Sequence, residues 1–215
     1  SPNNPTNPDS PIYDPSLELE QQPLDFWHRF AALGNRDNNL STELKDITFG
    51  TNGMIGSVSV EAGARKTINE SHNVGSGHIL RSIARQYIND GTYMLNDPFG
   101  ASAEVRNAMT VTTSRTGKFN QEEVFANAAF DIMETDAGAF QGFVGFEYRT
   151  EDYADNYDSL SEAGQVGGSS GSSAGGSRSV RGLFFEALVP VTEQFELNFA
   201  GRYDDYSDYG SDFSP

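Results

Sequence analysis

Hydrophobic and polar residues alternate along the chain, most fully in the segment from Phe140 to Arg149. One parity there reads Phe, Gly, Val, Phe and Tyr, and the other carries Gln141, Glu147 and Arg149. A period of two is typical of a β-strand with one apolar and one polar face. The same alternation is found in residues 57–65, 124–132, 182–189 and 196–204, with a weaker copy around Ile47 and Phe49. The pattern therefore predicts an all-β protein.

The connections between these strands alternate between short and long. Short turns are predicted, from their Gly, Asp and Pro residues, at 50–53, 136–138 and 190–194. The long connections are residues 1–40, 67–118 and 152–178, the last of which ends in a run of Gly and Ser. Long loops are uncommon in compact soluble domains, whereas bacterial outer-membrane barrels combine short periplasmic turns with long external loops. The three long connections are therefore predicted to be external loops.

The predicted strands are long enough to cross a bilayer. A tilted spanning strand needs roughly 9–11 residues, and the alternating segments at 122–133, 139–150 and 195–206 are each about a dozen residues long. Tyr148, Tyr203 and Tyr206 lie at strand ends away from the short turns, where barrels carry an aromatic girdle. We therefore expect an antiparallel transmembrane β-barrel segment with hairpins at 41–66, 119–151 and 179–208. A secreted β-sandwich with long strands is the alternative.

Composition removes several other classes of protein. The 215 residues carry 14 Lys+Arg and 31 Asp+Glu, a formal net charge of −17, which argues against nucleic acid as a partner. The absence of Cys excludes disulfide scaffolds, thiolate zinc sites and cysteine nucleophiles. The chain has no run of 18 apolar residues, so no membrane-spanning helix is predicted. The first residues show no initiator Met and no signal peptide, and the last residues stop in mid-pattern, so we expect the chain to be part of a longer protein.

The segment from Asp136 to the C-terminus resembles the barrel of proteobacterial TonB-dependent receptors. The resemblance rests on Val144–Glu151 (VGFEYRTE), Phe185–Pro190 (FEALVP) and Phe195–Gly210 (FELNFAGRYDDYSDYG), separated by the Gly/Ser loop. It is strong over 119–215, fair over 41–66 and thin in the loops. Each motif is weak by itself, but their order and spacing are specific as a set.

The resemblance implies energy-dependent import of a large or scarce solute, of the siderophore, cobalamin or oligosaccharide class, across the outer membrane. The chain would supply about six strands of a 22-stranded barrel. Outer-membrane lipid, a plug domain, the TonB energy-coupling complex and the small-molecule solute are the implied partners. Neither a plug domain nor a TonB box is visible in these residues. A passive porin-like or structural barrel and a secreted β-rich binding module remain the alternatives.

Strand parity places a set of charged side chains inside such a barrel. These candidate ligand-binding residues are Glu147, Arg149, Glu186, Arg202 and Asp204. Two interpretations remain open: contact with the solute or the plug, or a cross-strand ladder in which Glu147 and Arg149 face Arg202 and Asp204 and fix the strand register.

The predicted loops offer further candidates. Apolar residues at helical spacing between His78 and Asp90 predict a short helix in the loop 67–118. Trp27 and Tyr87 would offer aromatic surfaces to a ligand, or would only pack the loops. The three His residues have no convergent Cys or carboxylate spacing, and the acidic stretch 204–212 does not match a calcium loop, so we expect no metal and no cofactor. No catalytic motif is found, and we expect no enzyme activity.

Overall fold

The computed structural model describes residues 14–16 and 28–215, so Trp27 lies outside the described residues. The chain divides into two compact units. Unit 1 joins the residues up to Asn35 with Arg81–Thr110, and unit 2 comprises Arg36–Leu80 and Val111–Pro215. Unit 2 contains the sheet, and the two units are described separately.

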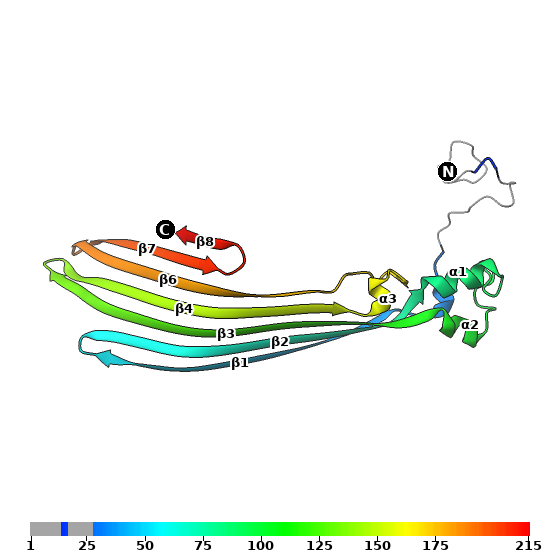
Figure 1. The fold of residues 1–215 in the computed structure, drawn as a ribbon, viewed down its shortest axis with the longest axis horizontal. Coiled ribbons are helices and arrows are strands. Elements are labelled where there is room, and N and C mark those ends of the chain that lie inside the picture. The colour runs from blue at the N-terminus through cyan, green and yellow to red at the C-terminus, as the bar shows by residue number, and fades with distance from the viewer. Residues whose placement is uncertain (1–13, 17–27) are drawn as a thin grey trace. The chain divides into compact units, whose positions relative to one another are not determined.

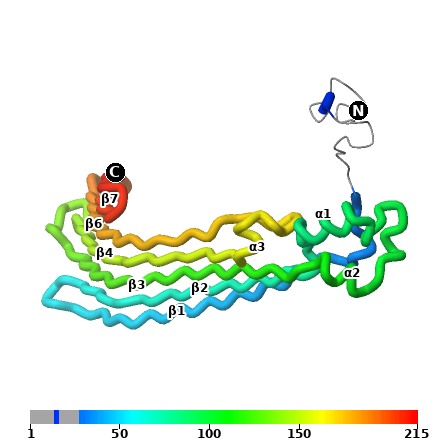
Figure 2. Tube along the Cα trace, turned by 45° about the vertical axis from the view of Figure 1, so that its right-hand side comes forward, coloured from blue at the N-terminus to red at the C-terminus, as the bar shows by residue number. Residues whose placement is uncertain are grey.

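Unit 2 is built on one antiparallel sheet, which confirms the all-β prediction (Figures 1 and 2). Its strands follow one another in the order β1-β2-β3-β4-β6-β7-β8, and the short β5 pairs with β2. The strands are β1 (Asp37–Ile55), β2 (Val58–Leu80), β3 (Thr110–Thr135), β4 (Gly138–Tyr157), β5 (Val166–Gly167), β6 (Ala174–Thr192), β7 (Phe195–Tyr206) and β8 (Gly210–Ser214). The described helices are η2 (Ala31–Leu33), α1 (Arg81–Asn89), α2 (Ala103–Ala108) and α3 (Ser159–Glu162). The predicted helix between His78 and Asp90 is confirmed as α1.

Three two-residue turns join β1 to β2, β3 to β4 and β6 to β7, and all lie at one end of the sheet (left in Figure 1). The turn expected at 50–53 is wrong: these residues belong to β1, where Gly50 pairs with Gly63. The chain reverses instead after Gly56, whose φ of 64° suits a tight hairpin turn and favours Gly. The turns expected near 136–138 and within 190–194 are found, the latter between Thr192 and Phe195.

The strands extend far into the segments that were expected to be loops. β2 runs on to Leu80, β3 begins at Thr110, β4 continues to Tyr157, and β6 begins at Ala174. Beyond the apolar stretches both faces of these strands are polar, so the period-two signal disappears while the backbone hydrogen bonds continue. Alternation therefore detects only the half-apolar part of each strand. β8 was missed because it has only 5 residues.

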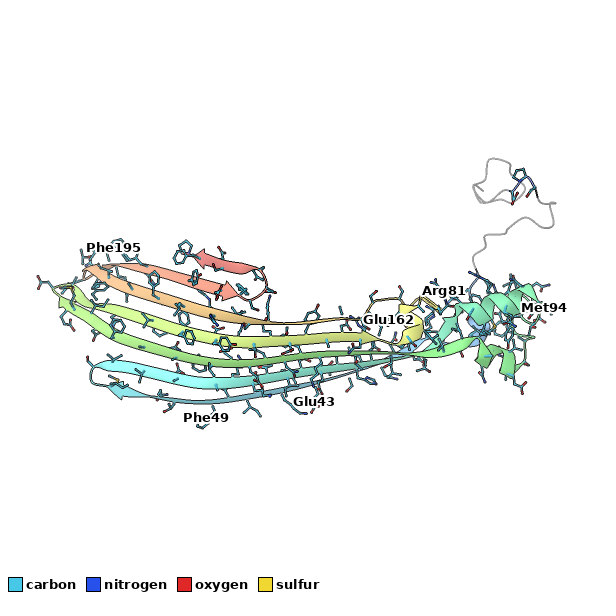
Figure 3. The ribbon with its side chains drawn as sticks, in the orientation of Figure 1. Glu43, Phe49, Arg81, Met94, Glu162 and Phe195 are labelled. Atoms are coloured by element: carbon cyan, nitrogen blue, oxygen red, sulfur yellow. The ribbon has the colours of Figure 1, made fainter. Side chains whose placement is uncertain are left out.

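The sheet has one apolar and one polar face. Val144 pairs with Ala128 on β3 and with Phe185 on β6, and Phe185 pairs with Gly201, which gives a row on the apolar face. The polar face carries the neighbouring rows, including Glu147. Apolar-face side chains are widely exposed: Phe49, labelled in Figure 3, retains 81% of its surface. In the described part of unit 2 only Val166 and Val180 are fully buried apolar side chains.

Unit 1 has a small core of its own. Tyr93 is 1% exposed, its hydroxyl lies 3.3 Å from His28 Nε2, and its ring lies beside Phe30. Ser102 caps α2 by accepting a hydrogen bond from the Val105 N–H. None of the described helices combines the length and the apolar character that crossing a membrane requires.

Candidate functional site

Six charged side chains form a continuous series of ion pairs on the polar face, here called the charge chain. Its members, from β7 through β4 to β6, are Asp204, Arg202, Glu147, Arg149, Glu151 and Arg178. Arg202 Nε lies 2.8 Å from Asp204, and Arg202 Nη2 lies 3.2 Å from Glu147. Glu147 also pairs with Arg149, and Glu151 lies 2.8 Å from Arg149 and 2.6 Å from Arg178. Signs alternate throughout, so the chain is electrically balanced.

The contact between Arg202 and Glu147 spans two strand spacings, about 9.5 Å, because β6 lies between β7 and β4. Gly182 makes this possible: it pairs with Glu147 on one side and with Asp204 on the other. A Cβ at Gly182 would lie 2.6 Å from Arg202 Nη2 and 3.1 Å from Asp204 Oδ1. Because Gly182 has no side chain, the Arg202 guanidinium can occupy the space where a Cβ would lie.

Aromatic rings occupy the space above two other strand glycines of the polar face, Gly145 and Gly63. The Phe184 ring lies over Gly145 on the adjacent strand, and the Arg202 guanidinium lies 5.4 Å from the centre of that ring. The Phe125 ring covers Gly63 in the same way, with its Cζ 2.7 Å from where a Cβ would be. Covering a strand glycine with an aromatic ring restores the packing that the glycine lacks.

Of the predicted cross-strand ion pairs, Glu147 with Arg202 is present, whereas Arg149 and Asp204 bond to residues of their own strands. Two residues that were not predicted, Glu151 and Arg178, add a second cross-strand pair. Glu151 and Arg178 continue the polar parity of β4 and β6. They could have been found by extending the alternation two residues beyond Arg149 and four residues before Gly182. Glu186 does not join the charge chain, because it accepts a hydrogen bond of 2.5 Å from Asn198 Nδ2 instead. Contact of these side chains with a solute or a plug stays a prediction.

Of the aromatic candidates, Tyr87 lies half-buried on α1 in unit 1, and Trp27 lies outside the described residues. Among residues 14–16 and 28–215, no group of three or more His, Cys, Asp or Glu side chains is arranged to hold a metal ion.

Residues 158–173, here called the roof segment, connect β4 to β6 at the ends of the strands opposite the three short turns (α3 in Figure 1). Its β5 pairs with β2, with Ile79 opposite Gly167 and Leu80 opposite Val166, so the segment passes β3 to reach that strand. Val166 is fully buried. The long connection is therefore a fixed structure rather than a free loop.

Asp158 anchors the roof segment to the sheet. Its carboxylate accepts hydrogen bonds from the Ser161 N–H at 2.9 Å, the Ser161 hydroxyl at 2.8 Å and the Ser114 N–H at 3.2 Å. Burial raises the pKa of Asp158, but these bonds and one from the Leu160 N–H outweigh it and leave the pKa below its ordinary value. The carboxylate is thus held in its charged form.

Long antiparallel strands, short turns at one end, one exposed apolar face and one charged face together define a strip of a membrane-type β-barrel. The chain matches the family model described as "TonB dependent receptor-like, beta-barrel" over residues 2–215, and it belongs to this family.

A solved structure described as the RagAB peptide transporter matches it with a TM-score of 0.55 and 13% identity, over 86% of this chain. The likeness at this identity is one of fold. The chain spans 20% of the length of that structure's chain. No curated protein sequence matches the chain.

Proposed function

We propose that the chain is part of the barrel of an outer-membrane receptor that imports a solute with energy supplied through TonB. The exposed apolar face is the observation that carries this proposal, because side chains such as Phe49, Phe185 and Phe199 stay largely exposed among the described residues. Lipid would cover that face, and the polar face with the charge chain would line the interior. The end with the three short turns would then be periplasmic.

Family membership supports the remaining parts of the proposal. A plug domain inside the barrel would meet the polar face, and a TonB complex would move the plug after the solute binds. The solute belongs to the siderophore, cobalamin or oligosaccharide class, and the structural neighbour adds peptides to the classes worth testing. The protein itself makes or breaks no covalent bond in this function.

Uptake measurements test the proposal. A strain that carries the intact receptor and a strain that lacks it are compared for accumulation of radiolabelled solutes from each class, with and without a functional TonB system. Accumulation that needs both the receptor and TonB is expected. Uptake that needs the receptor but not TonB would instead identify a passive barrel, and a receptor recovered folded in the soluble fraction would indicate a secreted module.

A further inference from the structure

A polar cavity of about 320 Å³ lies between the roof segment and the polar face of unit 2. This volume is at the lower end of the range for small-molecule sites, roughly 300–1,000 Å³. Side chains from four strands and the roof segment line it, among them Asn38, Asn73, His78, Thr113, Arg115 and Ser169. The strands supply the floor, and Gly168, Ser169 and Ser170 supply the cover.

An irregularity in β2 turns His78 into this cavity. Gly77 has a φ of 70°, the left-handed conformation that marks a bulge in a strand. Strict alternation would place His78 on the face opposite Gly75, yet a Cβ at Gly75 would lie 2.7 Å from His78 Nε2. The same point is 2.7 Å from Asn38 Oδ1 and 2.5 Å from Thr113 Oγ1. The polar side chains of His78, Asn38 and Thr113 therefore converge above Gly75, which has no side chain.

The cavity contains polar atoms without protein partners. His78 is 6% exposed, and neither of its ring nitrogens has a hydrogen-bond partner among the described residues. Asn73 Oδ1 is also buried and unpartnered. Buried polar groups are nearly always hydrogen-bonded, so unpartnered ones that face a cavity indicate a ligand that supplies both donors and acceptors.

The charges around the cavity favour a neutral ligand. Arg115 is the cation in the lining, and Asp155 holds its guanidinium through bonds of 2.8 and 2.5 Å while the Tyr157 ring lies 4.7 Å beneath it. No carboxylate is among the described residues that line the cavity, and Asp155 already neutralises the charge of Arg115. The remaining groups are amides, hydroxyls and an imidazole, which pair with alcohol groups as donors or acceptors.

We propose that this cavity binds one unit of an uncharged, polyhydroxylated solute, a sugar ring of an oligosaccharide, with His78, Asn73 and Asn38 bonded to its hydroxyl groups. This inference rests on the proposed import function and selects the oligosaccharide class among its solutes. The roof segment would hold the bound unit against β2 and β3.

Titration calorimetry on the intact receptor in detergent tests the site. The probes are neutral glucose and xylose oligosaccharides of two to six units, with a ferric siderophore, cobalamin and a short peptide as comparisons. His78→Phe keeps an aromatic ring at this position but removes both ring nitrogens. It should weaken sugar binding about tenfold or more. The melting temperature of this variant should not fall, because the removed nitrogens have no hydrogen-bond partner among the described residues. His72→Phe is the matched control, since His72 is exposed and lies outside this cavity.

The outcomes separate this inference from the proposed function. Sugar binding that His78→Phe weakens and His72→Phe leaves unchanged supports the site. Absence of sugar binding overturns the inference, and TonB-dependent uptake of another solute would leave the proposed function standing. Sugar binding without TonB-dependent uptake keeps the site but contradicts the proposed function. If His78→Phe also lowers the melting temperature, the affinity for sugar is measured on Asn73→Leu instead. Unchanged sugar affinity in Asn73→Leu contradicts the site.

Discussion

Replacing Phe199 with Arg should destabilise the barrel by about 2–4 kcal/mol, the cost of a cation at the lipid-facing midplane of an outer-membrane barrel. The position follows from the structure. The apolar face of β7 runs from Phe195 to Tyr203, and Phe199 is its middle residue, 55% exposed. Four residues on each side give about 14 Å of strand in both directions, so the tilted strand places Phe199 near the centre of an apolar band about 25 Å tall.

Asn198→Arg is the matched control, because Asn198 has nearly the same height but lies on the polar face. Its amide bonds to Glu186, and an Arg there would meet that carboxylate with opposite charge, so a much smaller loss is expected. The free energy of unfolding is measured by denaturant titration of the intact receptor in lipid vesicles. Equal losses in the two variants, or a larger loss in Asn198→Arg, would show that the two faces are wrongly assigned.

Two further predictions concern the charge chain and the roof segment. Gly182→Ala should displace Arg202 from Glu147 at a cost of about 1 kcal/mol or less, because the pair is partly exposed. Gly176→Ala on the same strand should be neutral, since its Cβ would meet only Tyr153 at 3.6 Å, and the same denaturant titration compares both variants. The lowered pKa of Asp158 means that its stabilisation of the roof segment is full above the ordinary value of 3.8 and is lost as the pH falls through the lower folded-state pKa. Proteolysis of the roof segment should therefore rise in strong acid. Asp158→Asn keeps a good helix cap but should abolish this pH dependence, and Asp158→Ala, which removes the cap, should cost about 1 kcal/mol.

The faces of the sheet could be predicted from sequence because one side of each strand is apolar over the part that lipid would cover. Parity then placed Glu147, Arg149, Arg202 and Asp204 on one face, where they belong to one series of ion pairs. Parity does not fix the register, because a shift of two residues leaves the face unchanged. The turn at Gly56 was missed because Gly50 and Gly53 offered a stronger composition signal than one Gly-Ser pair. Composition cannot tell a glycine needed for its φ from one needed for its small size.

The cavity beside His78 could not be predicted from the sequence. Four strands form its floor, and the roof segment that covers it lies about 90 residues after His78 in the chain. The left-handed conformation of Gly77 also breaks the parity by which the other polar-face residues were assigned. A Gly-x-Gly-His sequence within a polar stretch of strand is only a weak local signal of such a site. In the structure, the left-handed glycine directly before the buried histidine turns the histidine side chain to the other face.

The strand glycines serve at least two different purposes, and their surroundings distinguish them. If curvature alone required them, the space where each Cβ would lie should be open. This is the case at Gly53, where no atom of the described residues lies within 4 Å of that point. At Gly63, Gly145 and Gly182 that space is occupied instead by Phe125, Phe184 and Arg202 from neighbouring strands. These three glycines therefore act in cross-strand packing, and each belongs to a pair with the side chain that covers it. Substituting either member of such a pair should remove the same interaction, so the two losses in free energy should be less than additive in a double-mutant cycle.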